Sequence, residues 1–435
     1  MAVWWKELGK GILRSSGRLS YIEAAARHIL SAKDAPTIRT YEIPEIAPLR
    51  PHPSTSDRLR LNLLVPSINL SDSYGGILTA LRVFERLGEL IVSSSDAKLR
   101  IVTNTLIRDA SIVDLSKWNV VGSNDSDARY QVLEADQTGA RAIPISMHDV
   151  FVATFWPTVY QAERLRAWQE RSFGRKPAPL IYVIQDFEPG FYPWSSRYAY
   201  AEATYIQGAN TIAIFNSALL RAYFEKRGYS FLRRYHFEPR IDNELRAHLN
   251  PNTPKNRCIV VYGRPSSARN CFETICAGLK EWSRTSHGTP KWTIVSAGER
   301  HLNVPLENGL EIRSVGKLTL RDYAELLNES AIGISLMLSP HPSYPPLDMA
   351  HAGVLTITNS YAGKDLSSWH ENICSIDRVD PGELAKSVER CVRAFDEDNQ
   401  AGAKGKSRVD VYLRDDEGET WMADVALEIQ SWMRG

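Results

Sequence analysis

Short apolar runs alternate along this chain with longer segments whose apolar residues recur every three or four positions, and this alternation limits the fold more than any other feature. The run at residues 59–65, for example, precedes a segment with Leu78, Leu81 and Phe84 on one helical face. Apolar residues at that spacing indicate an amphipathic helix, and short apolar runs between helices are typical of buried parallel strands. The pattern predicts an α/β fold in which helices cover both faces of a parallel sheet.

The alternation occurs twice, and a polar, turn-rich stretch at about residues 237–257 separates the two series. The further apolar runs lie at 99–102, 150–155, 181–184 and 212–215 in the first series, and at 259–262, 292–295, 332–337 and 354–358 in the second. A domain boundary is therefore predicted between them. The expected parts are an N-terminal helical extension (1–56), a Rossmann-like domain (57–240), a second Rossmann-like domain (241–412) and a C-terminal helix (413–435).

Composition excludes several classes of protein. The chain has 52 basic and 51 acidic residues, so no nucleic acid or other strongly charged partner is expected. Its five cysteines form no CxxC pair, which argues against a disulfide framework and a cysteine zinc site and favours the cytoplasm. No apolar window is long enough to cross a membrane.

The first thirty residues are rich in tryptophan and in basic side chains, including Trp4, Trp5, Lys6 and Lys10. Such a segment can lie in a membrane interface, where indoles sit at the headgroups and cations meet anionic lipid. A peripheral contact of residues 1–30 with the inner face of the membrane is one interpretation. The other is a terminal helix docked on the body of the protein.

Several familiar motifs are incomplete. Residues 402–407 lack the first glycine of a P-loop, and Gly9 and Gly11 lack the third glycine of a dinucleotide fingerprint. Asp125 and Asp127 spell the DxD with which some sugar transferases hold a metal, but their Ser/Asn/Asp loop favours a role in turns. Neither a metal nor a cofactor is expected.

One loop of the second domain is suited to a diphosphate. It follows the run at 259–262 and contains Gly263, Arg264, Arg269 and Asn270, with a helix predicted from Asn270. Guanidinium groups bond phosphate oxygens in pairs, and helix N-termini present unpaired N–H groups. The alternative, two surface arginines beside a helix cap, stays open.

A second loop, residues 339–346, is rich in proline and leads into a short predicted helix with Asp348 in its first turn. Gly353 and another apolar run follow. A carboxylate at this place can accept hydrogen bonds from sugar hydroxyls, as a sugar ring requires. Helix capping alone would also explain Asp348.

In the first domain, the segment 184–194 follows a strand directly and combines two acids with four aromatic residues. Asp186 and Glu188 can bind or deprotonate a hydroxyl, and His148, before the run at residue 150, is a third catalytic candidate. Aromatic rings present faces to sugar C–H groups. The residues expected in the acceptor side of the cleft are Tyr74, Gly75, Gly76, Phe155, Trp156, Phe191, Tyr192 and Trp194.

The order and separation of these loops resemble the donor half of GT-B glycosyltransferases of the family-four type, in which a Gly-Arg loop and a later basic residue bind the nucleotide diphosphate. The segments 184–194 and 341–353 narrow the resemblance to bacterial rhamnosyltransferases of the WsaF type, over about residues 58–425. It implies two Rossmann-like domains facing a cleft and a C-terminal helix that crosses back to the first domain.

The resemblance also implies roles for other positions. The nucleotide base would lie against Val315, Gly316, Lys317 and Leu318, and the donor sugar against His341, Tyr344, Pro346, Leu347 and Asp348. The chain departs from the family motif at Pro340, where the first of two glutamates would fall, so His341 or a backbone N–H would take its place.

The function implied is metal-independent transfer of a deoxyhexose, L-rhamnose from dTDP-rhamnose, to a hydroxyl of a surface polysaccharide or its lipid-linked precursor. Two alternatives remain open. The first is a noncatalytic saccharide-binding module with the same fold, which the missing glutamate suggests. The second is a nucleotide-sugar epimerase that uses the same two domains. The acceptor, the linkage, the stereochemical outcome and the oligomeric state stay open as well.

Overall fold

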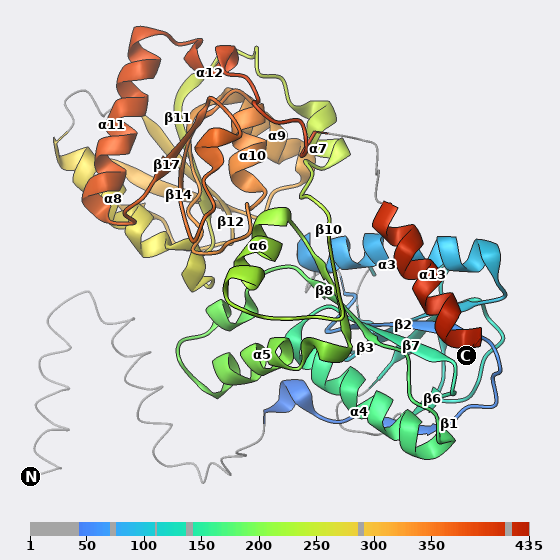
Figure 1. Ribbon diagram of the computed structural model, residues 1–435. Coiled ribbons are helices and arrows are strands. Elements are labelled where there is room, and N and C mark those ends of the chain that lie inside the picture. The colour runs from blue at the N-terminus through green and yellow to red at the C-terminus, as the bar shows by residue number, and fades with distance from the viewer. Residues whose placement is uncertain are drawn as a thin grey trace, which may run out of the picture. The chain divides into compact units, whose positions relative to one another are not determined.

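A computed structural model describes residues 43–69, 75–108, 111–135, 142–285, 291–413 and 420–434. The residues Ile46–Gly435 form one compact unit, to which the following description applies (Figure 1). Tyr74 and the tryptophan-rich stretch 1–30 lie outside the described residues. No helix in the described ranges is both long and apolar enough to cross a membrane.

The first domain is built on an eight-stranded sheet with the order β10-β9-β8-β7-β2-β3-β5-β4, in which every pair of neighbours is parallel. Its strands are β2 (Arg60–Val65), β3 (Lys98–Thr103), β4 (Asn119–Val121), β5 (Tyr130–Glu134), β7 (Asp149–Ala153), β8 (Leu180–Ile184), β9 (Thr211–Phe215) and β10 (Arg233–His236). A separate parallel pair joins β1 (Arg50–Pro53) to β6 (Ala142–Ile145). Because β1 falls inside the expected 1–56 extension, the folded body begins before residue 57.

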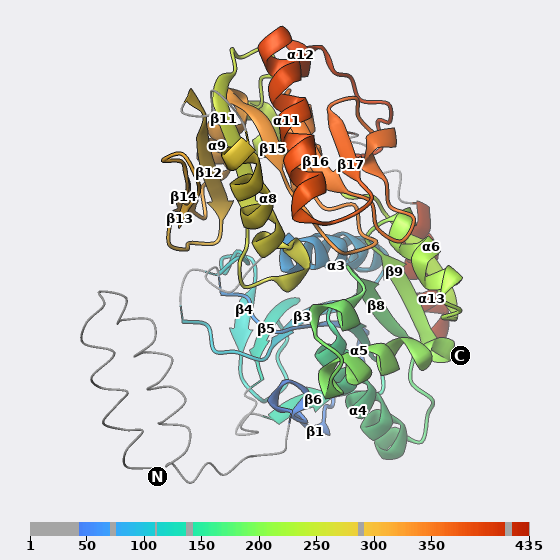
Figure 2. The same cartoon turned by 90° about the vertical axis from the view of Figure 1, so that its left-hand side faces the viewer.

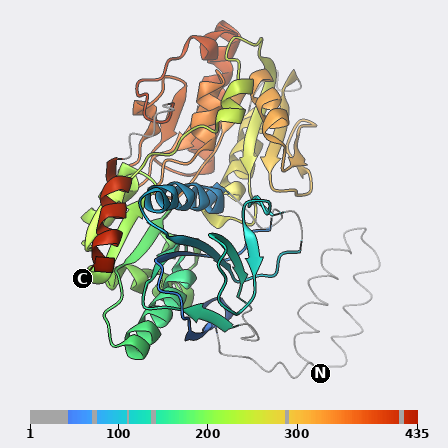
Figure 3. The ribbon, with the colours of Figure 1, turned by 90° about the vertical axis from the view of Figure 1, so that its right-hand side faces the viewer.

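Helices cover both faces of this sheet. The helices α3 (Gly75–Ser94) and α13 (Thr420–Arg434) share a core with one face, and Figure 3 shows them side by side. The other face is covered by α4 (Trp156–Phe173), α5 (Ser196–Ile206) and α6 (Ala218–Lys226). The C-terminal helix therefore packs on the first domain through the buried side chains of Trp421, Met422, Val425 and Ile429.

The second domain has a seven-stranded sheet with the order β13-β14-β12-β11-β15-β16-β17, parallel except for β13. Its strands are β11 (Asn256–Gly263), β12 (Thr293–Gly298), β13 (Val304–Pro305), β14 (Glu311–Gly316), β15 (Ser330–Ile334), β16 (Leu355–Asn359) and β17 (Ile373–Ile376). The helices α8 (Phe272–Thr285) and α11 (Pro381–Glu397) pack together on one face (Figure 2). The opposite face carries α7 (Asn243–His248), α9 (Leu320–Glu329) and α10 (Pro345–His351), and the short α12 (Ala401–Lys404) follows α11.

The expected double series of strands and helices is confirmed, with two shifts near the diphosphate loop. The helix predicted from Asn270 begins at Phe272, because Ala268–Asn270 form the 3₁₀ helix η5 and Cys271 adopts a left-handed backbone with φ 51°. The strand expected over 332–337 ends at Ile334, since the chain leaves the sheet there to enter the proline-rich loop.

A buried charge cluster lies beneath the first sheet, on β2, β3 and β7. The carboxylate of Asp149 accepts bonds from Arg60 Nε at 2.6 Å and Nη2 at 2.8 Å, and from Asn62 Nδ2 at 2.9 Å. Arg100 reaches the same cluster through Asn62 Oδ1 at 2.7 Å. Burial by itself would raise the pKa of Asp149, but the charges of Arg60 and Arg100 and these hydrogen bonds outweigh it and hold the pKa below its usual range.

Replacing Asp149 with asparagine should lower the free energy of unfolding by about 3 to 5 kcal/mol, because two buried guanidinium groups would lose their buried counter-charge. The carboxylate that remains, Asp125 at 3.7 Å from Arg60, is partly exposed. Urea unfolding of the purified variant measures the loss of stability. The matched control is Asp96→Asn, which removes exposed ion pairs to Arg58 at 3.0 Å and Arg129 at 3.6 Å and should change stability by about 0.5 kcal/mol or less. Equal losses in the two variants would contradict the structural role of the cluster.

Candidate functional site

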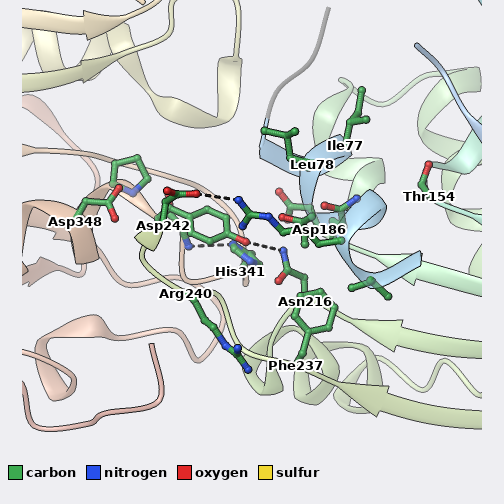
Figure 4. A pocket seen from close by; sticks show the side chains of 18 of the residues that line it. Ile77, Leu78, Thr154, Asp186, Asn216, Phe237, Arg240, Asp242, His341 and Asp348 are labelled. Carbon is green, nitrogen blue, oxygen red and sulfur yellow. Dashed lines mark hydrogen bonds and ion pairs between the residues drawn. The ribbon is translucent and has the colours of Figure 1, made fainter. Parts of the chain in front are cut away.

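A cavity of about 1080 Å³ lies between the carboxyl ends of the two sheets. Figure 4 shows Asp348 and His341 from the second domain on one side, and Asp186 and Thr154 from the first domain on the other. The predicted site residues that line it are Gly76, Phe155, Asp186, Glu188, Phe191, Arg264, Arg269, Asn270, Lys317, Leu318, His341, Tyr344 and Asp348. The loops that follow the strands therefore meet, as the parallel sheets require.

Other predicted residues in the described part of the chain do not line the cavity: Trp156, Tyr192, Trp194, Gly263, Val315, Gly316, Pro346 and Leu347. Val315 and Gly316 belong to β14 rather than to a loop, so only Lys317 and Leu318 face the cleft from that segment. Trp194 is 95% exposed and stands outside the cleft. Asp125 of the DxD sequence, also outside, accepts hydrogen bonds from Ser54 and Thr55.

The structure places His148, the third catalytic candidate, away from the cleft. It directly precedes β7, whereas the cleft is formed by segments that follow the strands, and it is not among the lining residues. The length of β7 therefore separates its imidazole from the cleft. The prediction of His148 rests on nearness in sequence to a strand, which does not specify which end of the strand carries the site.

Gly263, the last residue of β11, lies in close contact with the neighbouring strand β12. A Cβ atom at this position would lie 2.0 Å from Ser296 Oγ on the neighbouring strand β12, so no other residue fits without movement. Further along the loop, the Ser266 N–H donates a hydrogen bond to Glu299 Oε2 at 3.0 Å and so holds the loop in place. This arrangement carries Arg264 to the wall of the cleft, near the Glu299 carboxylate.

Arg269 joins the two domains. Its Nε lies 3.5 Å from Asp186 Oδ2, and its guanidinium carbon lies 4.1 Å from the centroid of the Phe191 ring. Asp186 and Phe191 both belong to the segment after β8 in the first domain, whereas Arg269 is on η5 in the second. A residue predicted for the donor diphosphate is thus held by residues predicted for the acceptor side.

Asp186 is fully engaged. Its Oδ1 accepts hydrogen bonds from the Phe187 N–H at 2.8 Å and from the Ser339 hydroxyl of the second domain, while Oδ2 faces Arg269. Ser339 Oγ in turn accepts the His341 N–H at 3.0 Å. Because both carboxylate oxygens have partners, Asp186 is poorly placed to take a proton from a substrate.

Glu188 has a different environment. Its Oε2 accepts the Trp156 N–H at 2.6 Å and the Tyr182 hydroxyl at 3.0 Å, and in the described part of the chain no hydrogen bond reaches Oε1. The residue is 2% exposed yet lines the cleft. Burial, with a smaller contribution from the Asp186 charge, raises the pKa of Glu188 to about 8. A raised pKa and one unbonded oxygen at a cleft are properties of a general base.

The proline-rich loop is held in a strained conformation. Ser343 has φ 73°, and its N–H donates to His341 Nδ1 at 3.0 Å. The imidazole proton must then be on Nε2, next to the Asn216 backbone. Burial lowers the pKa of His341 to about 4, so the ring is neutral and Nε2 is a donor at the cleft.

Asp348 lies in the first turn of α10 and, like Tyr323 of α9, lines the donor side of the cleft. Burial and the neighbouring Asp242 carboxylate raise the pKa of Asp348 to about 8. The Tyr323 hydroxyl is buried and has no hydrogen-bond partner among the described residues. These two groups offer polar contacts that a bound ligand would satisfy.

Sequence reasoning missed several lining residues. Three of them stand at the carboxyl end of a recognised strand: Gln185, Asn216 and Tyr262. The rule that parallel sheets bind ligands at the carboxyl ends of their strands applies to these residues too. Asn216 Nδ2 donates to the Tyr344 hydroxyl across the cleft at 3.2 Å. Arg240 and Asp242 also line it but lie in the stretch taken only as a domain boundary.

The cleft combines complementary chemistry on its two walls. The second domain contributes two arginines, which can bind a diphosphate, and neutral polar groups around His341 and Asp348. The first domain contributes the buried Glu188 carboxyl beside aromatic rings. A negatively charged leaving group and a hydroxyl nucleophile could therefore bind on opposite sides.

The comparisons with known proteins identify a family. Profiles of the N-terminal and C-terminal domains of WsaF match residues 60–218 and 257–389, which together are about two thirds of the chain. The O-antigen biosynthesis protein RfbC of Myxococcus xanthus is 29% identical over 244 residues, 55% of this chain. The match covers 18% of RfbC, so the chain spans only a small part of that relative's length.

Solved structures share the architecture at low sequence identity. TarM matches with a TM-score of 0.55 and 8% identity, over 87% of this chain and 99% of TarM. HepE from Anabaena, solved in complex with UDP, matches with a TM-score of 0.51 and 11% identity, over 87% of this chain and 99% of HepE. At these identities the likeness concerns the fold.

Proposed function

Because the chain belongs to the WsaF family and has the GT-B glycosyltransferase fold, we propose that it transfers a deoxyhexose from a nucleotide sugar to a hydroxyl group of a glycan. The proposal rests on one observation: Arg264 and Arg269 line one wall of the cleft, and the buried carboxyl of Glu188 lines the opposite wall. The arginines suit a diphosphate leaving group, and Glu188 suits the activation of a hydroxyl.

In the proposed reaction, the bond between the anomeric carbon and the diphosphate oxygen breaks, and a bond forms between that carbon and the acceptor oxygen. The acceptor proton passes to Glu188 Oε1, the oxygen without a hydrogen bond from the described residues. The nucleoside diphosphate leaves with its developing charge against Arg264 and Arg269. His341 Nε2–H and Asp348 offer a donor and an acceptor to the sugar hydroxyls.

We propose L-rhamnose as the sugar, dTDP-rhamnose as the donor and a surface polysaccharide or its lipid-linked precursor as the acceptor. The resemblance of the segments 184–194 and 341–353 to WsaF-type rhamnosyltransferases supports the donor. The relative RfbC, an O-antigen biosynthesis protein, supports the acceptor class. We also propose that no divalent metal is needed, because two guanidinium groups can neutralise the diphosphate.

The test begins with the melting temperature in the presence of dTDP, UDP and GDP sugars, because a ligand of the folded state alone raises it. The sugar nucleotide with the largest shift is then incubated, radiolabelled, with glycan acceptors, with and without EDTA. We expect dTDP-rhamnose to give the largest shift and a labelled product in both conditions.

Other outcomes would overturn particular parts of the proposal. Binding without product under all acceptor conditions would indicate a saccharide-binding module. A changed donor in the absence of acceptor would indicate an epimerase. Product that disappears with EDTA would overturn the metal-independent step, and transfer of a different sugar would overturn the assignment of rhamnose.

A further inference from the structure

Resting on the proposed function, we infer that Asp186 and Phe191 of the first domain are positioning residues for Arg269 of the second, so that the diphosphate site is complete only when the two domains are closed on each other. Asp186 then acts through Arg269, and Glu188 alone remains as the base. The segment after β8 serves the donor as well as the acceptor.

The first support is the way in which the guanidinium group of Arg269 is held. The Phe191 ring covers one face at 4.1 Å, and Asp186 Oδ2 lies 3.5 Å from Nε. Apart from this ion pair, no polar contact to the guanidinium is found within the described ranges, and Nε is buried. A ring on the face and a carboxylate at Nε leave the two Nη groups for a paired contact with phosphate oxygens.

The second support is that Asp186 is also bound to the loop of the donor sugar site. Ser339 donates to Asp186 Oδ1, and the backbone next to Ser339 is tied to Arg269 because the Leu338 N–H donates to the Arg269 carbonyl at 2.8 Å. Separation of the domains would therefore break the ion pair, the ring contact and the Ser339 bond together.

Breaking these contacts is costly because the Asp186 carboxylate is buried. A buried charge that loses its partner is destabilising, so an open arrangement would leave Asp186 short of partners and Arg269 free to rotate. A diphosphate held by Arg269 would favour the closed arrangement for the same reason. Binding of the donor and closure of the domains would thus be one event.

The experiment compares the affinities of dTDP and dTMP by isothermal titration, because only dTDP has the β-phosphate that Arg269 would hold. In Asp186→Asn, we expect dTDP binding to weaken about tenfold and dTMP binding to change little, so that their affinity ratio falls. Phe191→Leu should lower the ratio in the same direction. Glu202→Gln is the matched control, since Glu202 pairs with Arg227 at 3.4 Å and Arg227 stacks on Phe187, all within one domain.

Amide hydrogen exchange adds a readout of closure. In the wild type, dTDP should slow exchange at residues 187–191 of the first domain, and in Asp186→Asn this protection should be lost. Equal weakening of dTDP and dTMP, or a rise in their ratio, would overturn the inference. If the wild type binds none of dTDP, UDP and GDP, the proposed function fails as well; if it binds UDP or GDP in place of dTDP, that diphosphate and its monophosphate are compared.

Discussion

Replacing Arg269 with alanine should lower kcat/KM for sugar transfer by about a hundredfold to a thousandfold. It should also lower the melting temperature, because the buried Asp186 carboxylate loses its charged partner. The guanidinium group is the point at which the leaving diphosphate and the first domain meet, through Asp186 and Phe191. Its loss removes a positive charge that counts most as the bond to the diphosphate breaks. Initial rates with the radiolabelled donor measure the effect.

The matched control is Arg321→Ala on α9, an arginine of the same domain whose ion pair to Glu325 at 3.2 Å is exposed. This variant should keep its rate. In Arg264→Ala, kcat/KM for sugar transfer should fall about a hundredfold, since Arg264 lines the same wall of the cleft. Near-normal transfer by folded Arg269→Ala and Arg264→Ala would contradict a diphosphate site at this loop.

Replacing Glu188 with glutamine should lower kcat by about a hundredfold to ten-thousandfold and should abolish the pH dependence attributed to the base. Burial raises the pKa of Glu188 to about 8, so the carboxyl is mainly protonated at pH 7 and becomes able to accept a proton as the pH rises. The wild-type rate should therefore rise with pH, about tenfold per unit below pH 8, and then level off. Rates from pH 6 to pH 9.5 measure this.

The control for this profile is Asp348→Asn, because burial also raises the pKa of Asp348 to about 8. That variant should have a lower rate but the same rise through pH 8. If the rate no longer rises with pH in Asp348→Asn but still rises in Glu188→Gln, the titrating group is Asp348. That result would contradict the assignment of Glu188 as the base.

Much of the fold could be predicted because buried parallel strands are recognisable by their apolar runs. Strands β2, β3, β7, β8, β9, β11, β12, β15 and β16 coincide with runs in the sequence. The edge strand β10 and the strand β14, which lies next to the edge, were not recognised, because they are partly exposed and carry polar residues such as Arg233 and Glu311. Chain order alone also does not specify that β2 lies between β3 and β7.

The candidate site, like the fold, could be predicted from the sequence only in part. Arg264, His341 and Glu188 could be located because parallel sheets bring the segments after their strands to one edge. The different roles of Asp186 and Glu188 could not be predicted, since they stand two residues apart in one segment. Their roles diverge only because Ser339 and Arg269 of the other domain occupy the oxygens of Asp186.

The sequence by itself determined that two parallel α/β domains face each other and which loops form the cleft, because both follow from local periodicity and from the polarity of strand ends. Only the tertiary structure decided which carboxylate is available to a substrate and which arginine is shared between the domains. Those properties depend on burial and on contacts between residues far apart in the chain, such as Asp186 with Arg269, and local sequence does not record them.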